Sequence, residues 1–448
     1  MFLLIWRRIR DFIPSARLPH PIYNCLGLLG VAIYLFSREP LLFEKDIWPE
    51  GICGFFIGIN LYFIIEFTAC CFLDSRRTAT IIYGIAAVFS SILLASVKPS
   101  FWLTAIVALL PVAMIFFRRR WFWQKIAFVG GVAMGAALLS LPRHSLVRND
   151  EIGECFLPTQ LFVIHANLIR DQMADDLQRG AKVPYPREWL GRVHATLSAE
   201  IARSSAASRR YYGQSTLGFD PDYLMYNESS IVRQLHKEFG NNVSALCTFY
   251  RFYYWRIWRQ RPLLVVKKIV RQMAIFYAPK CPAYRLRTLT DEYNRSVTSL
   301  EPHRKIWTAY PPAMDFMSRT ALLARNPPVV QQPAYIRTPH HILAKTYLPL
   351  LLIALALSAV VFMQEEHRRR FGWLAALILF VCSYNLASCL AVAIVHSLEN
   401  PRYSTVQMFV TILAQFLTIL LILEVLLGSR DLIGRKPASQ LTRDPERI

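Results

Sequence analysis

HSLENPRY (His396–Tyr403) separates two long apolar segments, FGWLAALILFVCSYNLASCLAVAIV (Phe371–Val395) and STVQMFVTILAQFLTILLILEVLL (Ser404–Leu427). Each segment is long enough to cross a bilayer, which takes about 20 apolar residues as a helix. Charged side chains at a membrane boundary are costly unless they pair or bind a ligand. The glutamate and arginine of this short polar break therefore mark the first place to look for chemistry.

The composition of the whole chain agrees with a membrane protein. Of its 448 residues, 54% are hydrophobic and 18% are charged, and the apolar residues cluster in blocks. Such blocks indicate an integral membrane protein, and we expect an all-α polytopic fold with about eight transmembrane helices. The predicted spans are Ile22–Phe36, Gly51–Leu73, Ala79–Val97, Phe101–Phe117, Ile126–Leu141, Tyr347–Met363, Phe371–Val395 and Ser404–Leu427.

The basic residues of the short connections predict the orientation. With eight spans, one side receives these residues: Arg7, Arg8, Arg10, Arg76, Arg77, Arg118, Arg119, Arg120, Lys125, Arg368, Arg369, Arg370, Arg430, Arg435 and Lys436. That side is expected to be cytoplasmic, with both termini on it, in the inner (plasma) membrane. These anchors explain much of the net charge of +21. Since no nucleic-acid recognition motif accompanies the charge, membrane lipids are the expected partners and nucleic acid is not.

Four regions follow from this layout. We expect an N-terminal membrane domain of about five spans (1–141), a mainly helical extracytoplasmic insertion between spans five and six (142–346), a C-terminal membrane domain (347–428) and a cytoplasmic tail (429–448). Within the insertion, helices are predicted over Thr159–Gln178, Glu188–Ser208, Val243–Arg261 and Pro262–Phe276, followed by an irregular proline-rich connector.

Three groups of polar residues converge on the non-cytoplasmic surface in this topology. They are Glu44, Asp46 and Glu50 after the first span, Lys98 between spans three and four, and His396, Glu399, Arg402 and Tyr403 between spans seven and eight. Cations neutralise a phosphate leaving group, and a carboxylate acts as general base on a hydroxyl. The transfer of a group from a lipid phosphate to a hydroxyl needs both the cations and the carboxylate. Singly, each has a structural explanation: a snorkelling lysine, a Glu399–Arg402 pair or a solvated acidic turn.

The helix at Pro262–Phe276 carries Lys267, Lys268 and Arg271 against an apolar face, so it is expected to lie in the outer headgroup region or to pack on the membrane domain. Aromatic residues between Tyr250 and Trp258 suit the same interface. Asp171 and Asp175 share a helix face, but two carboxylates do not make a cation site, and neither a metal nor another cofactor is predicted. The insertion contains three cysteines, Cys155, Cys247 and Cys281, which allow one disulfide bond between two of them.

Three short motifs resemble elements of the GT-C superfamily of polytopic membrane glycosyltransferases. Glu399-Asn-Pro-Arg402-Tyr403 is similar to a Glu-x-x-Arg-Tyr element, and Lys98-Pro99 is similar to a Lys-Pro junction between paired spans. The segment Arg261–Met273 resembles a Pro-x-x-Tyr-x-x-Lys helix.

The resemblance implies an enzyme that takes a sugar from a polyprenyl-phosphate donor at the outer face of the membrane, for a cell-envelope glycan or lipid. It implies that Lys98, Arg402 and Tyr403 bind the donor phosphate, with Glu399 and His396 in support. An acidic residue of the first outer loop, Asp46 with Glu44, would be the base. A polymerase or ligase of lipid-linked saccharides, a non-catalytic assembly or export component, and a transporter remain open as alternatives.

Overall fold

The computed structural model describes residues 1–14, 16–37, 49–146, 151–210, 217–227, 229–240, 242–285, 308, 310–325 and 333–434. Glu44 and Asp46, the predicted catalytic carboxylates, lie outside these residues, and so does the side chain of Glu50. Within the described residues every regular element is a helix and none is a strand, which confirms the predicted all-α fold class.

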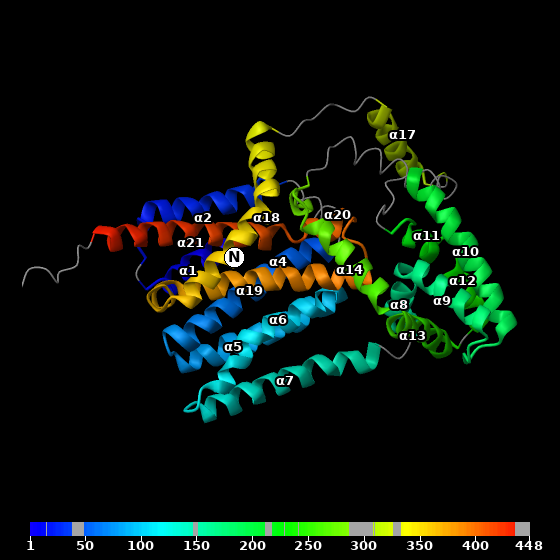
Figure 1. Ribbon diagram of the computed structural model, residues 1–448, viewed down its shortest axis with the longest axis horizontal. Coiled ribbons are helices and arrows are strands. Elements are labelled where there is room, and N and C mark those ends of the chain that lie inside the picture. Colours follow the sequence, from blue (N-terminus) through cyan, green and yellow to red (C-terminus); the bar gives the residue numbers. More distant parts are fainter. Residues whose placement is uncertain are drawn as a thin grey trace, which may run out of the picture.

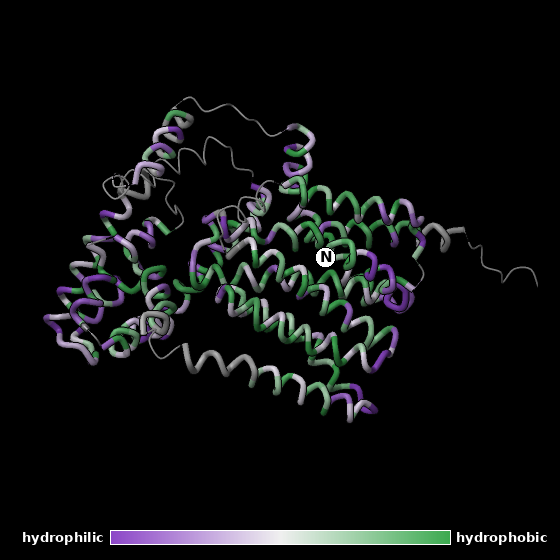
Figure 2. Tube along the Cα trace, turned by 180° about the vertical axis from the view of Figure 1, so that it is seen from behind, coloured by the Kyte–Doolittle hydropathy of each residue, from purple (hydrophilic) through white to green (hydrophobic). Residues whose placement is uncertain are grey.

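Six helical segments in the described part of the chain are long and apolar enough to cross a membrane. They are α4 with η2 (Pro49–Thr68, Ala69–Leu73), α5 (Arg77–Val97), η3, α6 and η4 (Pro99–Phe101, Trp102–Ala113, Met114–Phe117), α18 (Ala334–Met363), α19 (Glu365–Val395) and α21 (Met408–Gly434). Most of them run side by side in Figure 1, and Figure 2 shows that their residues are mainly hydrophobic. The chain is therefore a multi-pass membrane protein, in agreement with the sequence-based prediction.

The other two predicted spans are also helical, although neither belongs to these six. α2 (His20–Leu35) packs on α21, and α7 (Phe122–Leu146) packs on α5 and lies beside it in Figure 1. Gly131 and Gly135 face α5: a Cβ at Gly131 would lie 2.3 Å from Cδ1 of Ile85, and one at Gly135 would lie 1.7 Å from Cζ of Phe89. Small residues at this four-residue spacing allow two helices to approach closely within a bilayer. We refer to α2, α4–α7, α18, α19 and α21 as the membrane bundle.

The basic connections gather at one end of the membrane bundle. Arg8 pairs with Asp74 at 2.5 Å, and Arg118 donates to the carbonyl oxygen of Cys71 at 2.9 Å. On the same side, the rings of Phe72 and Trp373 are 5.6 Å apart. Lys98 stands at the opposite end of α5 from Arg77. Among the described residues, Arg8, Arg77 and Arg118 thus share one end of the membrane bundle, and Lys98 lies at the other.

A helical lobe lies at that other end, as Figure 1 shows. It consists of α8 (Glu151–Ile164), α9 (Ala166–Arg179), α10 (Arg187–Arg210), α11 (Pro221–Tyr226), α12 (Ile231–Phe239) and α13 (Val243–Gln260). α14 (Pro262–Phe276) and α20 (Pro401–Thr405) lie between the lobe and the membrane bundle, and α17 (Pro311–Arg325) lies farther along the chain. We refer to α8–α13 as the lobe.

The aromatic residues of α13 form the core of the lobe and not a membrane-interface belt. Phe249, Tyr250 and Tyr253 are fully buried, and the ring of Phe162 on α8 lies 4.8 Å from that of Tyr250. Aromatic side chains at successive helical turns are used here to pack α13 against α8 and the start of α10. α13 thus packs within the lobe and not on the membrane bundle, and Trp255 remains 58% exposed.

The connector predicted to be irregular contains a helix, α17 (Pro311–Arg325), and two other helices also differ from the prediction. α18 begins at Ala334, inside the predicted connector. Its N-terminal half is stabilised by the buried side chains of Leu343, Ala344 and Tyr347. These contacts offset the backbone hydrogen bonds that are lost at Pro339 and Pro349. The single helix predicted over Thr159–Gln178 is instead two helices that meet at His165. The hydrophobic periodicity of the sequence reveals neither the start of α18 nor the break at His165.

Two polar side chains inside the membrane bundle, Asn385 and Glu66, have structural partners. Asn385 accepts hydrogen bonds from Tyr277 (3.1 Å) and Tyr347 (2.9 Å), and it donates to Gln407 at 3.2 Å. Glu66 pairs with Arg8 at 3.2 Å. The transporter hypothesis depends on Glu66 and Asn385, two polar residues within predicted spans. Both side chains have partners within the fold, so they have a structural role.

α1 (Phe2–Ile9) packs tightly on α2. Its Trp6 donates from Nε1 to the carbonyl oxygen of Tyr23 at 2.9 Å, and this bond fixes the indole ring. A Cβ at Gly27 would lie 2.3 Å from Cδ1 of Trp6, and one at Gly30 would lie 2.8 Å from Cζ of Phe2. Only glycine therefore fits at Gly27 without moving a hydrogen-bonded ring.

We expect Gly27→Ala to destabilise the protein by about 1–3 kcal/mol, the usual cost of overpacking, and to lower its unfolding temperature in detergent by several degrees. Gly130→Ala on α7 is the matched control, because no atom lies within 4 Å of the added Cβ. Heating followed by size-exclusion chromatography measures both variants. Equal unfolding temperatures for the two would contradict the packing described for α1.

Candidate functional site

Lys98 lies at the end of the membrane bundle that faces the lobe, because Pro99 ends α5. A residue before proline is driven out of helical geometry, and Lys98 has an extended backbone (φ −145°, ψ 108°). Its amide still closes the last turn by donating to Leu94 at 3.2 Å. The following turn, η3, packs on α19, which brings the lysine toward the polar break that follows α19.

That polar break positions Arg402 and Tyr403. α19 ends where His396 adopts an extended backbone, and α20 starts again five residues later. The side chain of Asn400 accepts a hydrogen bond from the amide of Arg402 at 3.3 Å, and Pro401 occupies the first helical position. Both are favoured at helix starts, so the local sequence fixes α20 and the two residues that it carries.

The ring of Tyr403 is the common contact of three of the predicted site residues (Lys98, His396 and Arg402). Nζ of Lys98 lies 4.2 Å from the ring centroid and Cζ of Arg402 lies 4.9 Å from it. Arg402 also donates from Nη2 to the Tyr403 hydroxyl at 3.0 Å, and the His396 ring is 4.4 Å away. Tyr403 itself is only 8% exposed. We call these four residues the Tyr403 cluster.

Lys98 and Arg402 bring two positive charges to one aromatic ring. Each cation is attracted to the π-face by about 0.5–2 kcal/mol, but the two positive charges repel each other. A phosphate group between them would relieve this repulsion, and arginine can hold it with two parallel hydrogen bonds. The cluster therefore has the chemistry expected of a phosphate site.

Asp222 of the lobe also faces the cluster, although no pattern in the sequence singles it out. Its Oδ1 lies 3.9 Å from Nε2 of His396. Burial, and secondarily the neighbouring Asp220, raises the pKa of the Asp222 carboxyl, whereas the charge of Arg402 lowers it. A carboxylate with a raised pKa is suited to accept a proton near neutral pH. Asp222 lies 174 positions before His396 in the chain, so no local spacing could have revealed this pair.

His396 is held as a neutral imidazole. Its Nδ1 accepts a hydrogen bond from the amide of Ser397 at 2.8 Å, so the neutral ring carries its proton on Nε2, which faces Asp222. Burial, followed by the charges of Arg402, Lys98 and Lys268, lowers the pKa of His396 to about 3. The ring therefore adds no third positive charge to the cluster at neutral pH.

α14 supports the cluster from the lobe side. Lys268 donates from Nζ to the carbonyl oxygen of Ala393 at 2.6 Å, and burial lowers its pKa to about 7. Gln272 accepts from the hydroxyl of Ser397 at 3.0 Å and from the amide of Leu398 at 2.9 Å. α14 thus fixes the backbone on which the cluster is built.

The remaining predicted residues lie around the cluster. Glu399 is half-buried and its amide donates to the hydroxyl of Ser397 at 3.3 Å. Lys267 and Arg271 are exposed on α14 and line a cavity with Lys268. The structure therefore brings Lys98, His396, Arg402 and Tyr403 together, and it does not test the roles predicted for Glu44 and Asp46.

The acidic face of α9 is ion-paired. Asp176 forms a two-point pair with Arg256 (2.6 and 2.7 Å), and Asp175 pairs with Arg261. Within the described residues no group of three or more histidine, cysteine, aspartate or glutamate side chains has metal-binding geometry. The described cysteines, among them Cys155, Cys247 and Cys281, are free thiols.

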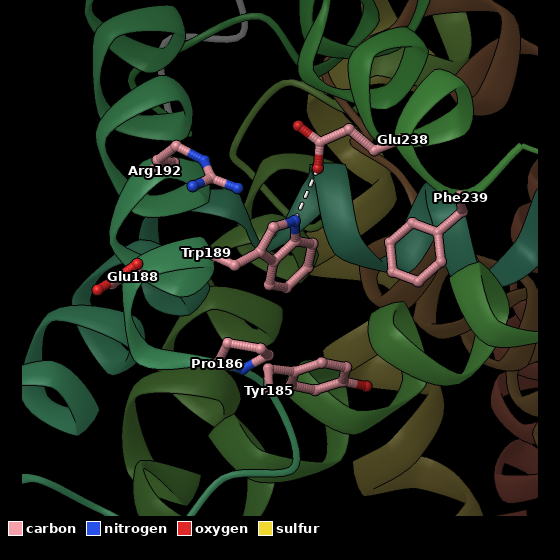
Figure 3. Close-up of a pocket in the computed structure, with 7 residues that line it drawn as sticks. All are labelled: Tyr185, Pro186, Glu188, Trp189, Arg192, Glu238 and Phe239. Atoms are coloured by element: carbon pink, nitrogen blue, oxygen red, sulfur yellow. Dashed lines mark hydrogen bonds between the residues drawn. The ribbon is translucent and has the colours of Figure 1, made fainter.

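The lobe carries a second, more open cavity of about 480 Å³. Figure 3 shows its lining of Tyr185, Pro186, Glu188, Trp189, Arg192, Glu238 and Phe239. Trp189 donates from Nε1 to Glu238 at 2.7 Å, so the indole is fixed at the rim. Aromatic faces beside carboxylates and a guanidinium suit a ligand rich in hydroxyl groups.

Acidification should destabilise the protein through His396, because a base whose pKa is lowered by folding binds protons more readily in the unfolded chain. Its contribution is intact above the ordinary pKa of 6.5 and is lost as the pH falls toward 3. Between pH 6.5 and pH 5 the loss approaches about 2 kcal/mol. We expect the unfolding temperature of His396→Gln to fall less than that of the wild type over this range.

His236→Gln, at an exposed position of α12, is the matched control and should keep the wild-type pH profile. Unfolding temperatures of the three proteins, measured in one detergent from pH 5 to pH 8, make the comparison. A wild-type profile for His396→Gln would contradict the burial described for this ring.

Comparison with known proteins identifies no relative: no family model, no curated protein and no solved structure matches the chain. The assignment of a function therefore depends on the site itself. That site is a cluster of two cations, a neutral histidine and a tyrosine, faced by a carboxylate of the lobe, at one end of a membrane bundle.

Proposed function

We propose that this chain is a membrane glycosyltransferase that takes a sugar from a polyprenyl-phosphate donor at the outer face of the inner (plasma) membrane, for a cell-envelope glycan or lipid. The observation that carries this proposal is the shared contact of Lys98 and Arg402 with the ring of Tyr403. It supports a phosphate site at the membrane surface, where the head of a lipid-linked donor would lie. The resemblance of Glu399–Tyr403 and Lys98-Pro99 to GT-C elements supports the same reaction.

The proposed topology has eight spans, with α2 and α7 crossing the membrane beside the six segments that are long enough by themselves. The close approach of α7 to α5 at Gly131 and Gly135 supports this count. Both termini are then cytoplasmic, because the end that carries Arg8 and Arg118 is the more basic one among the short connections. The lobe and the Tyr403 cluster face the opposite side.

The proposed reaction assigns a role to each group of the cluster. The oxygen of an acceptor hydroxyl attacks the anomeric carbon of the sugar, and the bond from that carbon to the phosphate oxygen breaks. Lys98 and Arg402 stabilise the negative charge that develops on the polyprenyl phosphate as it leaves. The hydroxyl proton passes to a carboxylate. Asp222 is the described candidate for this base, and Asp46 and Glu44 of the first outer loop are the candidates from the sequence.

We expect Arg402→Ala and Lys98→Ala each to weaken the binding of a polyprenyl monophosphate by about tenfold or more, since a hydrogen bond to a charged group contributes about 1.5–3 kcal/mol. The probe is the leaving group itself, added to purified full-length protein, and thermal stabilisation reports binding. Arg251→Ala, an exposed cation on α13, is the control and should bind like the wild type. Wild-type binding by both site variants would overturn the phosphate site.

We expect the base to be separable from the phosphate site. Asp222→Asn keeps the shape of the side chain and should lower glycan formation by about 10²–10⁴-fold, the usual contribution of a general base. Polyprenyl phosphate binding should remain. Surface-glycan profiles of cells that carry Asp222→Asn or Asp46→Asn, in place of the wild-type chain, identify which carboxylate acts. An unchanged profile for both, with Arg402→Ala also unchanged, would contradict the proposed enzyme and favour an assembly or export component.

A further inference from the structure

A cavity of about 200 Å³ lies under α14, beside the Tyr403 cluster. Its lining includes His165 and Asn167 at the junction of α8 and α9, Phe219 of the lobe, and Lys267, Lys268 and Arg271 of α14. Sites for drug-sized ligands usually span roughly 300–1,000 Å³, so this one suits the head of a molecule and not all of it. We call it the α14 cavity.

His165 lines the α14 cavity and carries a buried acceptor that no described residue uses. Its Nδ1 lies 2.9 Å from the carbonyl oxygen of Leu161, so Nδ1 must carry the proton and Nε2 must carry a lone pair. The residue is 2% exposed, and Nε2 has no hydrogen-bond partner among the described residues. Leaving a buried acceptor unsatisfied costs about 1–3 kcal/mol. A ligand that donates a hydrogen bond would recover that energy.

The fold holds this histidine at a helix break. α8 ends at Ile164, α9 starts at Ala166, and His165 between them has a non-helical backbone (φ −109°, ψ 17°). Its ring lies 5.3 Å from that of Tyr254, which holds it edge-on against α13. The imidazole is therefore fixed by packing and by Leu161, and only Nε2 remains for a ligand.

The cations Lys267 and Arg271 of α14 give the same cavity a positive field. Lys267 and Arg271 are one helical turn apart on the exposed face, and Lys268 follows on the side toward the membrane bundle. Burial, and then the charge of Lys268, keeps the pKa of His165 well below its ordinary value, so the ring itself is neutral. The cavity thus combines a place for an anion with one neutral acceptor.

The exposed face of α14 continues into apolar side chains. Leu263 is 81% exposed and Val270 is 59% exposed, and Val266 lies between them on the same face. Apolar residues flanked by lysine and arginine are typical of a helix that lies among lipid headgroups. The source of an anion at this place is then a lipid, whose chains contact these side chains while its head enters the cavity.

The positive field also determines which donor can reach His165. An ammonium group would donate to Nε2, but the charges of Lys267 and Arg271 repel it. A neutral hydroxyl donates without that cost, and a phosphate nearby pairs with Lys267 and Arg271. We propose that the α14 cavity binds the headgroup of an anionic phospholipid that carries a free hydroxyl, with the phosphate on Lys267 and Arg271 and the hydroxyl donating to Nε2 of His165. This binding does not depend on sugar transfer.

Short-chain phospholipids that differ only in the head test the proposal on purified full-length protein, with thermal stabilisation as the measurement. Dihexanoyl phosphatidylglycerol has both groups, dihexanoyl phosphatidylmethanol has the phosphate alone, and dihexanoyl phosphatidylethanolamine has an ammonium. We expect phosphatidylglycerol to bind about tenfold more tightly than phosphatidylmethanol, the value of one buried hydrogen bond, and phosphatidylethanolamine to bind most weakly. Equal binding of the three would overturn the proposal.

Glycerol 1-phosphate separates the two sources of the same chemistry. It has the phosphate and hydroxyls without acyl chains, and we expect it to bind at least tenfold more weakly than phosphatidylglycerol because it loses the contacts with Leu263 and Val270. Binding as tight as that of the lipid would overturn the assignment of a phospholipid and identify a soluble phosphate ester instead.

Variants assign each half of the headgroup. His165→Phe should abolish the preference for phosphatidylglycerol over phosphatidylmethanol while both still bind, and His165→Gln, which restores an acceptor, should recover part of it. Lys267→Gln with Arg271→Gln, on the exposed face where folding is not at risk, should weaken both lipids. Arg233→Gln with Lys237→Gln, an exposed pair at the same spacing on α12, is the matched control. A preference that survives His165→Phe, or lipid binding that survives loss of both α14 cations, would contradict the site.

Discussion

The contact of Lys98 and Arg402 with the ring of Tyr403 is the interaction on which the lobe-facing end of the membrane bundle depends. The two positive charges lie 4.2 and 4.9 Å from one ring centroid, and each is attracted to the π-electrons of the ring. The lobe brings Asp222 to this place, and the buried His396 beside it stays neutral. The phosphate-bearing ligand that we propose for this site would add negative charge between the two cations.

The bilayer explains why these groups meet at one end of the helices. Asn385, within the membrane bundle, has partners that hold helices together, namely Tyr277, Tyr347 and Gln407. Charges that serve a ligand are therefore expected at the ends. α14 adds to this end both the hydrogen bonds that fix the loop after α19 and a separate cavity of its own.

Hydrophobic blocks predicted most of the fold, because a span must be apolar over its whole length. The same logic failed where prolines interrupt a packed helix, as at the start of α18, and where one helix becomes two at His165. An even number of predicted spans separates Lys98 from Arg402. Together with the positions of the arginine residues, this is enough to predict that the two residues lie at the same end of the bundle. Asp222 was not predicted as part of a site. It becomes significant only through a contact between distant segments, and it stands in no motif of its own.

Chemical cross-linking tests the central arrangement most directly. In a Cys25→Ser background, which removes the exposed native thiol, Lys98→Cys and Arg402→Cys should be joined within one chain by a short bifunctional maleimide, and mass spectrometry should recover the linked peptide. Arg119→Cys paired with Arg402→Cys is the control: residues 99–117 form a membrane-spanning segment of about 28 Å between positions 98 and 119, so no link should form. Linkage of 119 to 402 but not of 98 to 402 would contradict the shared site.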